Sequence, residues 1–116
     1  MVTANEDLSI DEFYKKNPEL NFSRIPILSD TKIESYVLKD TILENIINNK
    51  GKLKLTDIKR PIIISLDDTK IPKLFDKLLK EREHISLVVD QFNTTVGIVT
   101  LEDIIETILG LSLIHI

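Results

Sequence analysis

The chain is self-similar when it is shifted by 62 positions, and this repeat limits the folds that it can adopt. The superposition pairs apolar residues throughout: Ile25 with Leu87, Ile27 with Val89, Val37 with Val99, Leu43 with Ile105 and Ile46 with Ile108. A unit of about fifty residues buries too little surface to close a core alone. The repeat therefore predicts two related units that pack on each other with pseudo-twofold symmetry and form two equivalent clefts between their sheets.

The second unit shows the element order β-α-β-β-α. Residues 61–65 form a short β-rich run, and a helix follows in which Ile71, Leu74, Phe75, Leu78 and Leu79 share one face. Pro72 falls in the first turn of this helix, where its missing N–H costs little, and the capping candidates are Asp67, Asp68 and Thr69. The remaining predicted elements are a strand at 85–89, a turn at 90–95, a strand at 96–99 and a helix at 102–109.

The first unit repeats this order more faintly. Its predicted elements are a strand at 2–4, a helix from 9 to 17, strands at 24–28 and 33–38 and a helix at 41–49. The first helix opens on Ser9 and Glu12, the pattern of a capping box. The whole chain is thus predicted to be a mixed α/β (α+β) protein made of two tandem β-α-β-β-α units.

Composition excludes several classes of function. The net charge of −4 and the scarcity of aromatic residues argue against a nucleic-acid surface. The basic residues Lys50, Lys52, Lys54, Lys59 and Arg60 are interpreted as a solvated connector, with an anion-binding patch as the alternative. Without cysteine the chain has neither a disulfide nor a thiolate zinc site. No signal peptide is apparent, and no apolar run approaches the roughly 20 residues needed to cross a bilayer.

Enzyme signatures are missing from the sequence. It contains no glycine-rich phosphate loop, no nucleophile elbow and no HExxH motif. His84 and His115 stand alone, and a packing or capping role is expected for His84. We therefore expect a chain that is not an enzyme.

A threonine and an aspartate three residues apart, Thr100 and Asp103, open the last predicted helix. The pair fits a helix cap, with Thr100 as N-cap and Asp103 in the first turn. On local sequence alone capping is the favoured reading, but the pair also fits a ribose site, because a carboxylate and a hydroxyl would lie beside a helix N-terminus. At the matching junction of the first unit, Leu38 and Thr41 occupy these places although the helix pattern continues there. A helix start does not require the pair, which favours ribose binding in the second unit and an empty cleft in the first.

Longer motifs around this pair resemble one branch of the CBS domains. The stretch V-V-D-Q-F-N-T-T-V-G-I-V-T-L-E-D-I-I-E at 88–106 is similar to the CBS pair (Bateman module) of the CorC/HlyC/CNNM family, membrane proteins linked to magnesium and cobalt transport. The first half agrees through S-R-I-P-I at 23–27 and S-Y-V-L-K-D at 35–40. Gln91 replaces the family's Glu, and Asn93 and Thr94 replace a Gly-Gly pair; Asn tolerates the left-handed conformation that such a turn uses.

The resemblance implies a regulatory CBS pair that binds an adenine nucleotide (AMP, ADP or ATP), with or without Mg²⁺. The nucleotide-binding residues would be Thr100, Asp103, Arg24, Ile63 and Val99. Arg24, which the repeat pairs with Ser86, would contact phosphate, with a surface ion pair as the alternative. Ile63 and Val99 would sandwich the adenine, with a core role as the alternative. No metal site formed by side chains is expected.

The resemblance also implies a setting for the module. It would be a domain at the cytoplasmic face of a membrane protein, form a homodimer through its helices and control an attached magnesium or cobalt transport domain. The expected divisions are a first unit at 1–52, a second at 53–110 and an atypical tail at 111–116, which is foreign, frayed or a docking strand. The alternative function is a structural or dimerisation module of the same membrane protein without a ligand.

Overall fold

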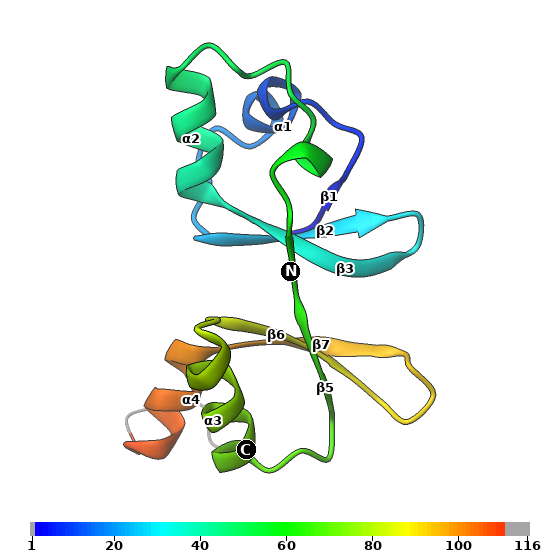
Figure 1. The fold of residues 1–116 in the computed structure, drawn as a ribbon, viewed down its shortest axis with the longest axis vertical. Coiled ribbons are helices and arrows are strands. Elements are labelled where there is room, and N and C mark those ends of the chain that lie inside the picture. The colour runs from blue at the N-terminus through cyan, green and yellow to red at the C-terminus, as the bar shows by residue number, and fades with distance from the viewer. Residues whose placement is uncertain (1, 111–116) are drawn as a thin grey trace. The chain divides into compact units, whose positions relative to one another are not determined.

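The computed structural model describes residues 2–110, which form two compact units (Figure 1). Unit 1 extends to Pro61 and unit 2 begins at Ile62. Each contains the order β-α-β-β-α, so the predicted fold class is confirmed. The predicted tail at 111–116 lies outside the described residues.

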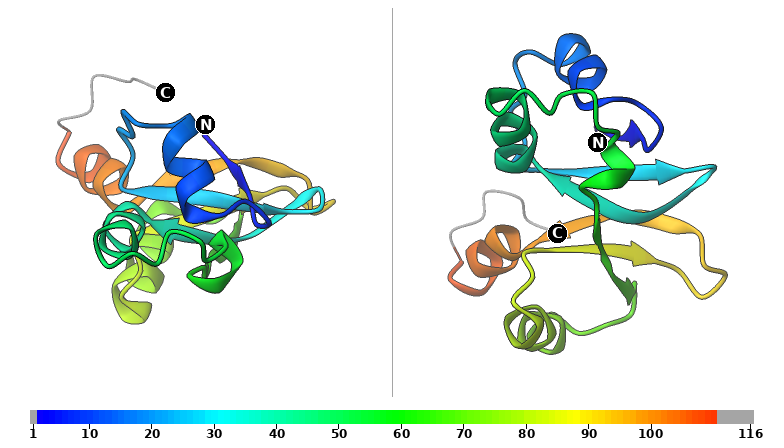
Figure 2. Two further views of the ribbon diagram at one scale, coloured as in Figure 1. Left: turned by 90° about the horizontal axis from the view of Figure 1, so that it is seen from above. Right: turned by 45° about the horizontal axis from the view of Figure 1, so that its top comes forward.

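Unit 1 is a four-stranded sheet covered by two helices. Its elements are β1 (Ala4–Asn5), α1 (Ile10–Lys16), β2 (Arg24–Ser29), β3 (Lys32–Leu38), α2 (Lys39–Ile47), a 3₁₀ turn (Leu55–Asp57) and β4 (Arg60–Pro61). The sheet order is β1-β2-β3-β4, in which only the β1–β2 pair is parallel. Figures 1 and 2 show α1 and α2 on the same face of this sheet.

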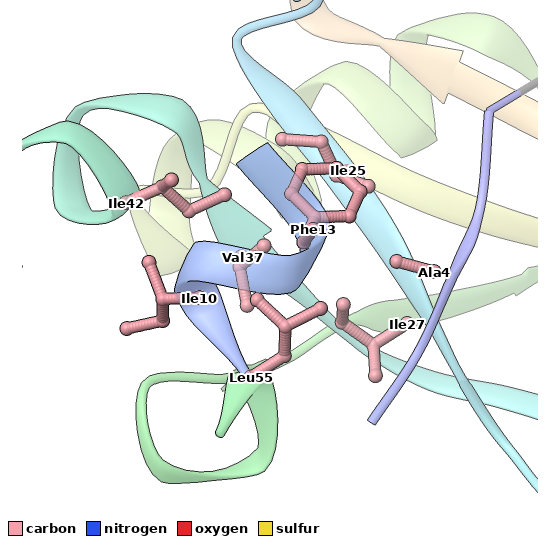
Figure 3. Close-up of a cluster of buried hydrophobic side chains, with 8 residues drawn as sticks. All are labelled: Ala4, Ile10, Phe13, Ile25, Ile27, Val37, Ile42 and Leu55. Carbon is pink, nitrogen blue, oxygen red and sulfur yellow. The ribbon is translucent and has the colours of Figure 1, made fainter. Parts of the chain in front are cut away.

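The core of unit 1 lies between that sheet face and the two helices (Figure 3). Phe13 of α1 and Ile42 of α2 are almost fully buried there. They pack with side chains from the strands, the helices and the 3₁₀ turn: Ala4, Ile10, Ile25, Ile27, Val37 and Leu55. Because Leu55 completes this core, the segment after α2 belongs to the first unit.

The basic connector is attached to the N-terminus of α1. The carbonyls of Gly51 and Leu53 accept hydrogen bonds from the N–H groups of Asp11 and Ile10, at 2.9 and 2.8 Å. Lys59 Nζ lies 3.1 Å from Glu6 Oε2, and this bond lowers the pKa of Glu6 below its ordinary value. These contacts explain why the compact units divide after Pro61 and not at the expected position 52, since the segment that follows α2 packs on unit 1.

The capping box predicted at α1 is present. The N–H of Glu12 donates to Ser9 Oγ at 3.0 Å, and the N–H of Ser9 donates to Glu12 Oε1 at 3.1 Å. The bond from the Ser9 backbone, and next the one with its side chain, holds the pKa of Glu12 below the ordinary 4.5. The sequence therefore specified both members of this cap.

We expect the Glu12→Gln variant to have a flatter pH dependence of stability in acid. A carboxyl with a lowered folded-state pKa stabilises the fold above its unfolded pKa, here about 4.5, and loses that contribution as pH falls through the folded-state pKa. Urea unfolding of both proteins from neutral pH down to pH values below 4.5 measures the effect. Identical slopes in the acid range would contradict it.

Unit 2 is a three-stranded sheet with two helices. Its elements are β5 (Ile63–Leu66), α3 (Ile71–Glu81), β6 (Ile85–Val89), β7 (Thr95–Thr100) and α4 (Leu101–Ile108). The sheet order is β5-β6-β7, with β5 parallel and β7 antiparallel to β6. Leu74 and Leu78 of α3 form a buried cluster with Leu101 and Ile104 of α4. Pro72 lies in the first turn of α3, as predicted.

The structure corrects several local predictions. The strand expected at 61–65 is divided, because Pro61 pairs with β3 whereas Ile63 begins β5 beside β6. The cap expected for α3 from Asp67, Asp68 or Thr69 is absent: Lys70 is the N-cap and makes no side-chain bond. β1 begins at Ala4 and not Val2, and α2 covers 39–47 in place of 41–49. Asn93 is confirmed as a left-handed turn residue with φ of 64°.

Within residues 2–110, no helix combines the length and the apolar character that a membrane span requires.

Candidate functional site

The candidate site is the start of α4, where β7 ends. Thr100 is the last residue of β7, pairs with Ile85 of β6 and has the extended backbone of an N-cap. Its Oγ1 accepts a hydrogen bond from the N–H of Asp103 at 3.2 Å. The carbonyl of His84 accepts from the N–H of Leu101 at 2.8 Å. Two of the N–H groups that a helix start leaves unpaired are thus satisfied by neighbouring residues.

Asp103 does not complete a capping box. At α1 the Glu12 carboxylate bonds back to the N-cap backbone, but within the described residues the Asp103 carboxylate makes no hydrogen bond or ion pair. It lies exposed in the first turn of α4, where negative charge is favoured by the helix dipole. The Thr100 hydroxyl alone carries the side-chain cap, and the Asp103 carboxylate is available to a ligand.

The equivalent helix start in unit 1 shows which bonds form this junction when the threonine and aspartate pair is absent. Leu38 is the N-cap of α2 and makes no side-chain bond. The N–H of Lys39 donates to the carbonyl of Ser23 at 2.8 Å, the counterpart of the bond between Leu101 and His84. Both units therefore build this junction from backbone bonds. The hydroxyl and the carboxylate are additions in unit 2.

These bonds also correct the pairing predicted for Arg24. Arg24 lies opposite Leu38 in the β2–β3 pair, whereas Ile85 lies opposite Thr100 in the β6–β7 pair. The counterpart of Arg24 is thus Ile85 and not Ser86, because the second hairpin is longer by one residue. Arg24 is half-buried, and its buried Nε has no hydrogen-bond partner within residues 2–110.

Ile63 and Val99 lie in one row of the unit 2 sheet. Both are opposite Ser86, one on each side of β6. Their side chains pack against the cluster formed by α3 and α4 and remain partly exposed. The core role that the sequence left open for them is therefore present in the structure. Side chains alternate along a strand, so Thr100 lies on the opposite face of β7 from Val99.

His84 is the residue near this site that sequence reasoning gave the least weight. Its backbone supports the first turn of α4, and its Nδ1 lies 3.5 Å from Glu102 Oε1. In the sequence, the only indication of this supporting role was the position of His84 directly before β6, whose first residue, Ile85, pairs with Thr100. Within the described part of the chain, no group of three or more His, Asp or Glu side chains is arranged to hold a metal ion.

Two short units in tandem, each with two helices on one sheet, define the class of the protein as a tandem α/β module. The family model of the CBS domain matches residues 55–110. The crystal structure of the CBS domain of a putative transporter from Clostridium difficile 630 is 31% identical, covers 95% of this chain and 85% of its own, and has a TM-score of 0.82. The chain belongs to the CBS-domain family and is a CBS pair related to the modules of CorC/CNNM Mg²⁺ transporters and hemolysin-like proteins.

Two further relatives support this relationship. The CBS domain of a bacterial CNNM/CorC family Mg²⁺ transporter, solved in complex with ATP, is 26% identical with a TM-score of 0.86 and covers 95% of this chain and 80% of its own. The magnesium and cobalt efflux protein CorC of Vibrio cholerae is 29% identical over 112 residues, 95% of this chain. The chain spans 38% of that protein's length. As a member of this group the module is non-catalytic, as predicted.

Proposed function

We propose that the start of α4 in unit 2 binds an adenine nucleotide. The observation that carries this proposal is the Asp103 carboxylate: the backbone N–H of Asp103 bonds to the Thr100 hydroxyl, but the carboxylate takes no part in capping. An ionised carboxylate can accept hydrogen bonds from both ribose hydroxyls. The Thr100 hydroxyl accepts from the Asp103 N–H and still has its own proton to donate to ribose or to the α-phosphate. The ATP complex of the 26% identical transporter CBS domain supports this proposal.

The other predicted residues have supporting roles in the proposal. The buried Nε of Arg24 lacks a partner within the described residues, and a phosphate oxygen would satisfy it. Ile63 and Val99 stay in the proposal as adenine contacts through their partly exposed surfaces; because they pack against the helices, on the opposite sheet face from Thr100, this contact requires the adenine to reach the helix side of the sheet.

Magnesium would reach such a site with the nucleotide. No cluster of three ligating side chains is present among residues 2–110, so these residues by themselves offer no cage for the ion. Mg²⁺ prefers to keep several waters and to share phosphate oxygens. Its contribution would be to neutralise phosphate charge, while Thr100 and Asp103 hold the sugar.

The proposed role is regulatory. A nucleotide that binds one arrangement of the module more tightly than another shifts the population toward that arrangement. In a longer protein of the CorC type this shift would control an attached magnesium or cobalt transport domain from the cytoplasmic face of the membrane.

Calorimetric titration with AMP, ADP and ATP, each with and without Mg²⁺, tests nucleotide binding. We expect saturable heat for at least one nucleotide and no hydrolysis of it after long incubation. No heat for any of them would refute the proposal and favour the alternative, a dimerisation module without a ligand.

That alternative is supported by the apolar surface of the unit 2 helices. Ile108 and Leu109 at the end of α4 are 52% and 62% exposed, and Leu79 of α3 is 50% exposed. Exposed apolar patches on helices are typical of protein interfaces. We therefore include homodimerisation through these helices in the proposal, since dimerisation and nucleotide binding are compatible.

We expect the Ile108→Glu variant to be monomeric. A charge placed in an apolar interface is desolvated without a partner, and in a symmetric dimer the penalty applies twice. Sedimentation velocity compares this variant with Phe92→Glu, which introduces the same charge at a residue that is 78% exposed and lies outside the helices. A dimer that survives in both variants, or is lost equally in both, would contradict the assignment to α4.

A further inference from the structure

Unit 2 has a groove at the end of its sheet opposite to the α4 start. The groove has a volume of about 360 Å³ and is lined by Leu66, Asp67, Asp68, Asp90, Gln91 and Phe92. Thr100 pairs with the first residue of β6, whereas the groove begins where β5 and β6 end. At about 3.3 Å per residue, the length of β6 places the two sites roughly 13 Å apart. Figure 1 shows the β6–β7 turn and α4 at opposite ends of the sheet.

The charge of this acidic groove is not compensated within the described residues. The Asp67 and Asp68 side chains are exposed and make no hydrogen bond or ion pair there. Asp90 uses Oδ1 to accept the N–H groups of Phe92 and Thr94, both at 2.9 Å, which leaves its negative charge in place. Three carboxylates, those of Asp67, Asp68 and Asp90, therefore line one groove.

Large apolar side chains accompany these carboxylates. Phe92 is 78% exposed and Leu66 is 52% exposed, although each could have been polar at no cost to the core. The turn that presents Phe92 is held by the Asp90 bonds and by the left-handed backbone of Asn93. The aromatic ring is thus presented on an ordered turn, so little entropy is lost when a partner covers it.

A metal ion does not account for the groove. Its three aspartates are not arranged as a metal-holding group, since no such group occurs among residues 2–110. A metal ion would also leave Phe92 and Leu66 uncovered. A polypeptide segment with cationic and apolar side chains matches both the charge and the exposed apolar surface.

We propose that the acidic groove is a docking site for a basic polypeptide segment in which lysine or arginine alternates with large apolar side chains. The apolar side chains of the partner cover Phe92 and Leu66, and its cations lie between the carboxylates. The interaction weakens with salt, because exposed charges are screened at high ionic strength. It is independent of nucleotide binding, which uses the other end of the sheet.

Fluorescence anisotropy with a labelled peptide that alternates lysine with phenylalanine and glycine tests this proposal. We expect the Asp67→Asn/Asp68→Asn variant and the Phe92→Ala variant each to bind the peptide about tenfold more weakly. Asp76→Asn, which removes an exposed carboxylate on α3 outside the groove, is the matched control and should bind as the unchanged chain does. ATP titrations of the same variants should be unaltered, so failure here is distinguishable from failure of the nucleotide proposal.

Several outcomes would overturn the proposal. A peptide with glutamate in place of lysine that binds equally well would exclude charge recognition, and a lysine–glycine peptide that binds equally well would exclude the apolar component. Self-association of the chain that is lost in the groove variants would show that a second copy is the occupant. Calorimetric binding of MgCl₂ alone that is lost in Asp67→Asn/Asp68→Asn would assign the groove to a metal.

Discussion

The Asp103→Ala variant is expected to bind ATP about 10- to 100-fold more weakly than the unchanged chain. Hydrogen bonds to a charged group contribute about 1.5–3 kcal/mol, and each 1.4 kcal/mol corresponds to a tenfold change in affinity. The carboxylate is exposed and makes no side-chain bond within residues 2–110, so its removal leaves no buried group unpaired. The variant should therefore fold, with at most the small loss of a favourable dipole interaction at α4.

Four matched variants make this result specific. Asp103→Asn keeps an acceptor without the charge and should have an intermediate affinity. Thr41→Ala changes the corresponding position in unit 1 and should leave binding unaltered. Thr100→Ser keeps the hydroxyl and the cap, whereas Thr100→Ala loses both and should lower stability by about 1 kcal/mol. Calorimetry gives the affinities and thermal unfolding confirms the folds; equal affinity in Asp103→Ala and the unchanged chain would refute a ribose role for the carboxylate.

The architecture was predictable because its signals are local and repeated. The apolar spacing of α3 places its buried leucines on one face, and the pair Ser9 and Glu12 determines where α1 begins. Shifting the sequence by 62 positions aligned Leu38 with Thr100, and both are the N-caps of their helices. That alignment separated the residues needed for a helix start from those added to it.

Other features depend on pairing between distant segments, which a single sequence does not reveal. Residues 61–65 are continuous and β-rich, yet Pro61 and Ile63 belong to different sheets. A one-residue difference between the two hairpins moved the counterpart of Arg24 from Ser86 to Ile85. Ile63 and Val99 are apolar residues beside the candidate site, but only the register showed that they face the helices together. For the same reason the acidic groove was not foreseen, since it combines two loops that are distant in the sequence.

The largest effect on stability is expected from Phe13→Ala in the core of unit 1. Phe13 is 1% exposed and is surrounded by side chains from both helices, the sheet and the 3₁₀ turn (Figure 3). Truncation of a buried phenylalanine costs about 3–5 kcal/mol, a large part of the 5–15 kcal/mol that stabilises a typical domain. For a small domain this corresponds to a fall in Tm of more than about 12 °C.

Phe92→Ala is the matched control for this prediction, because the same atoms are removed from a side chain that is 78% exposed. Its stability should change by no more than about 0.5 kcal/mol. Because a unit of this size is marginal alone, the loss of the unit 1 core in Phe13→Ala should be seen as one transition for the whole chain in circular dichroism. Two separate transitions, with unit 2 and its ATP binding retained after unit 1 has unfolded, would contradict this expectation. They would show that the α4 start binds ATP without a folded unit 1, and would remove Arg24 from the proposed nucleotide site.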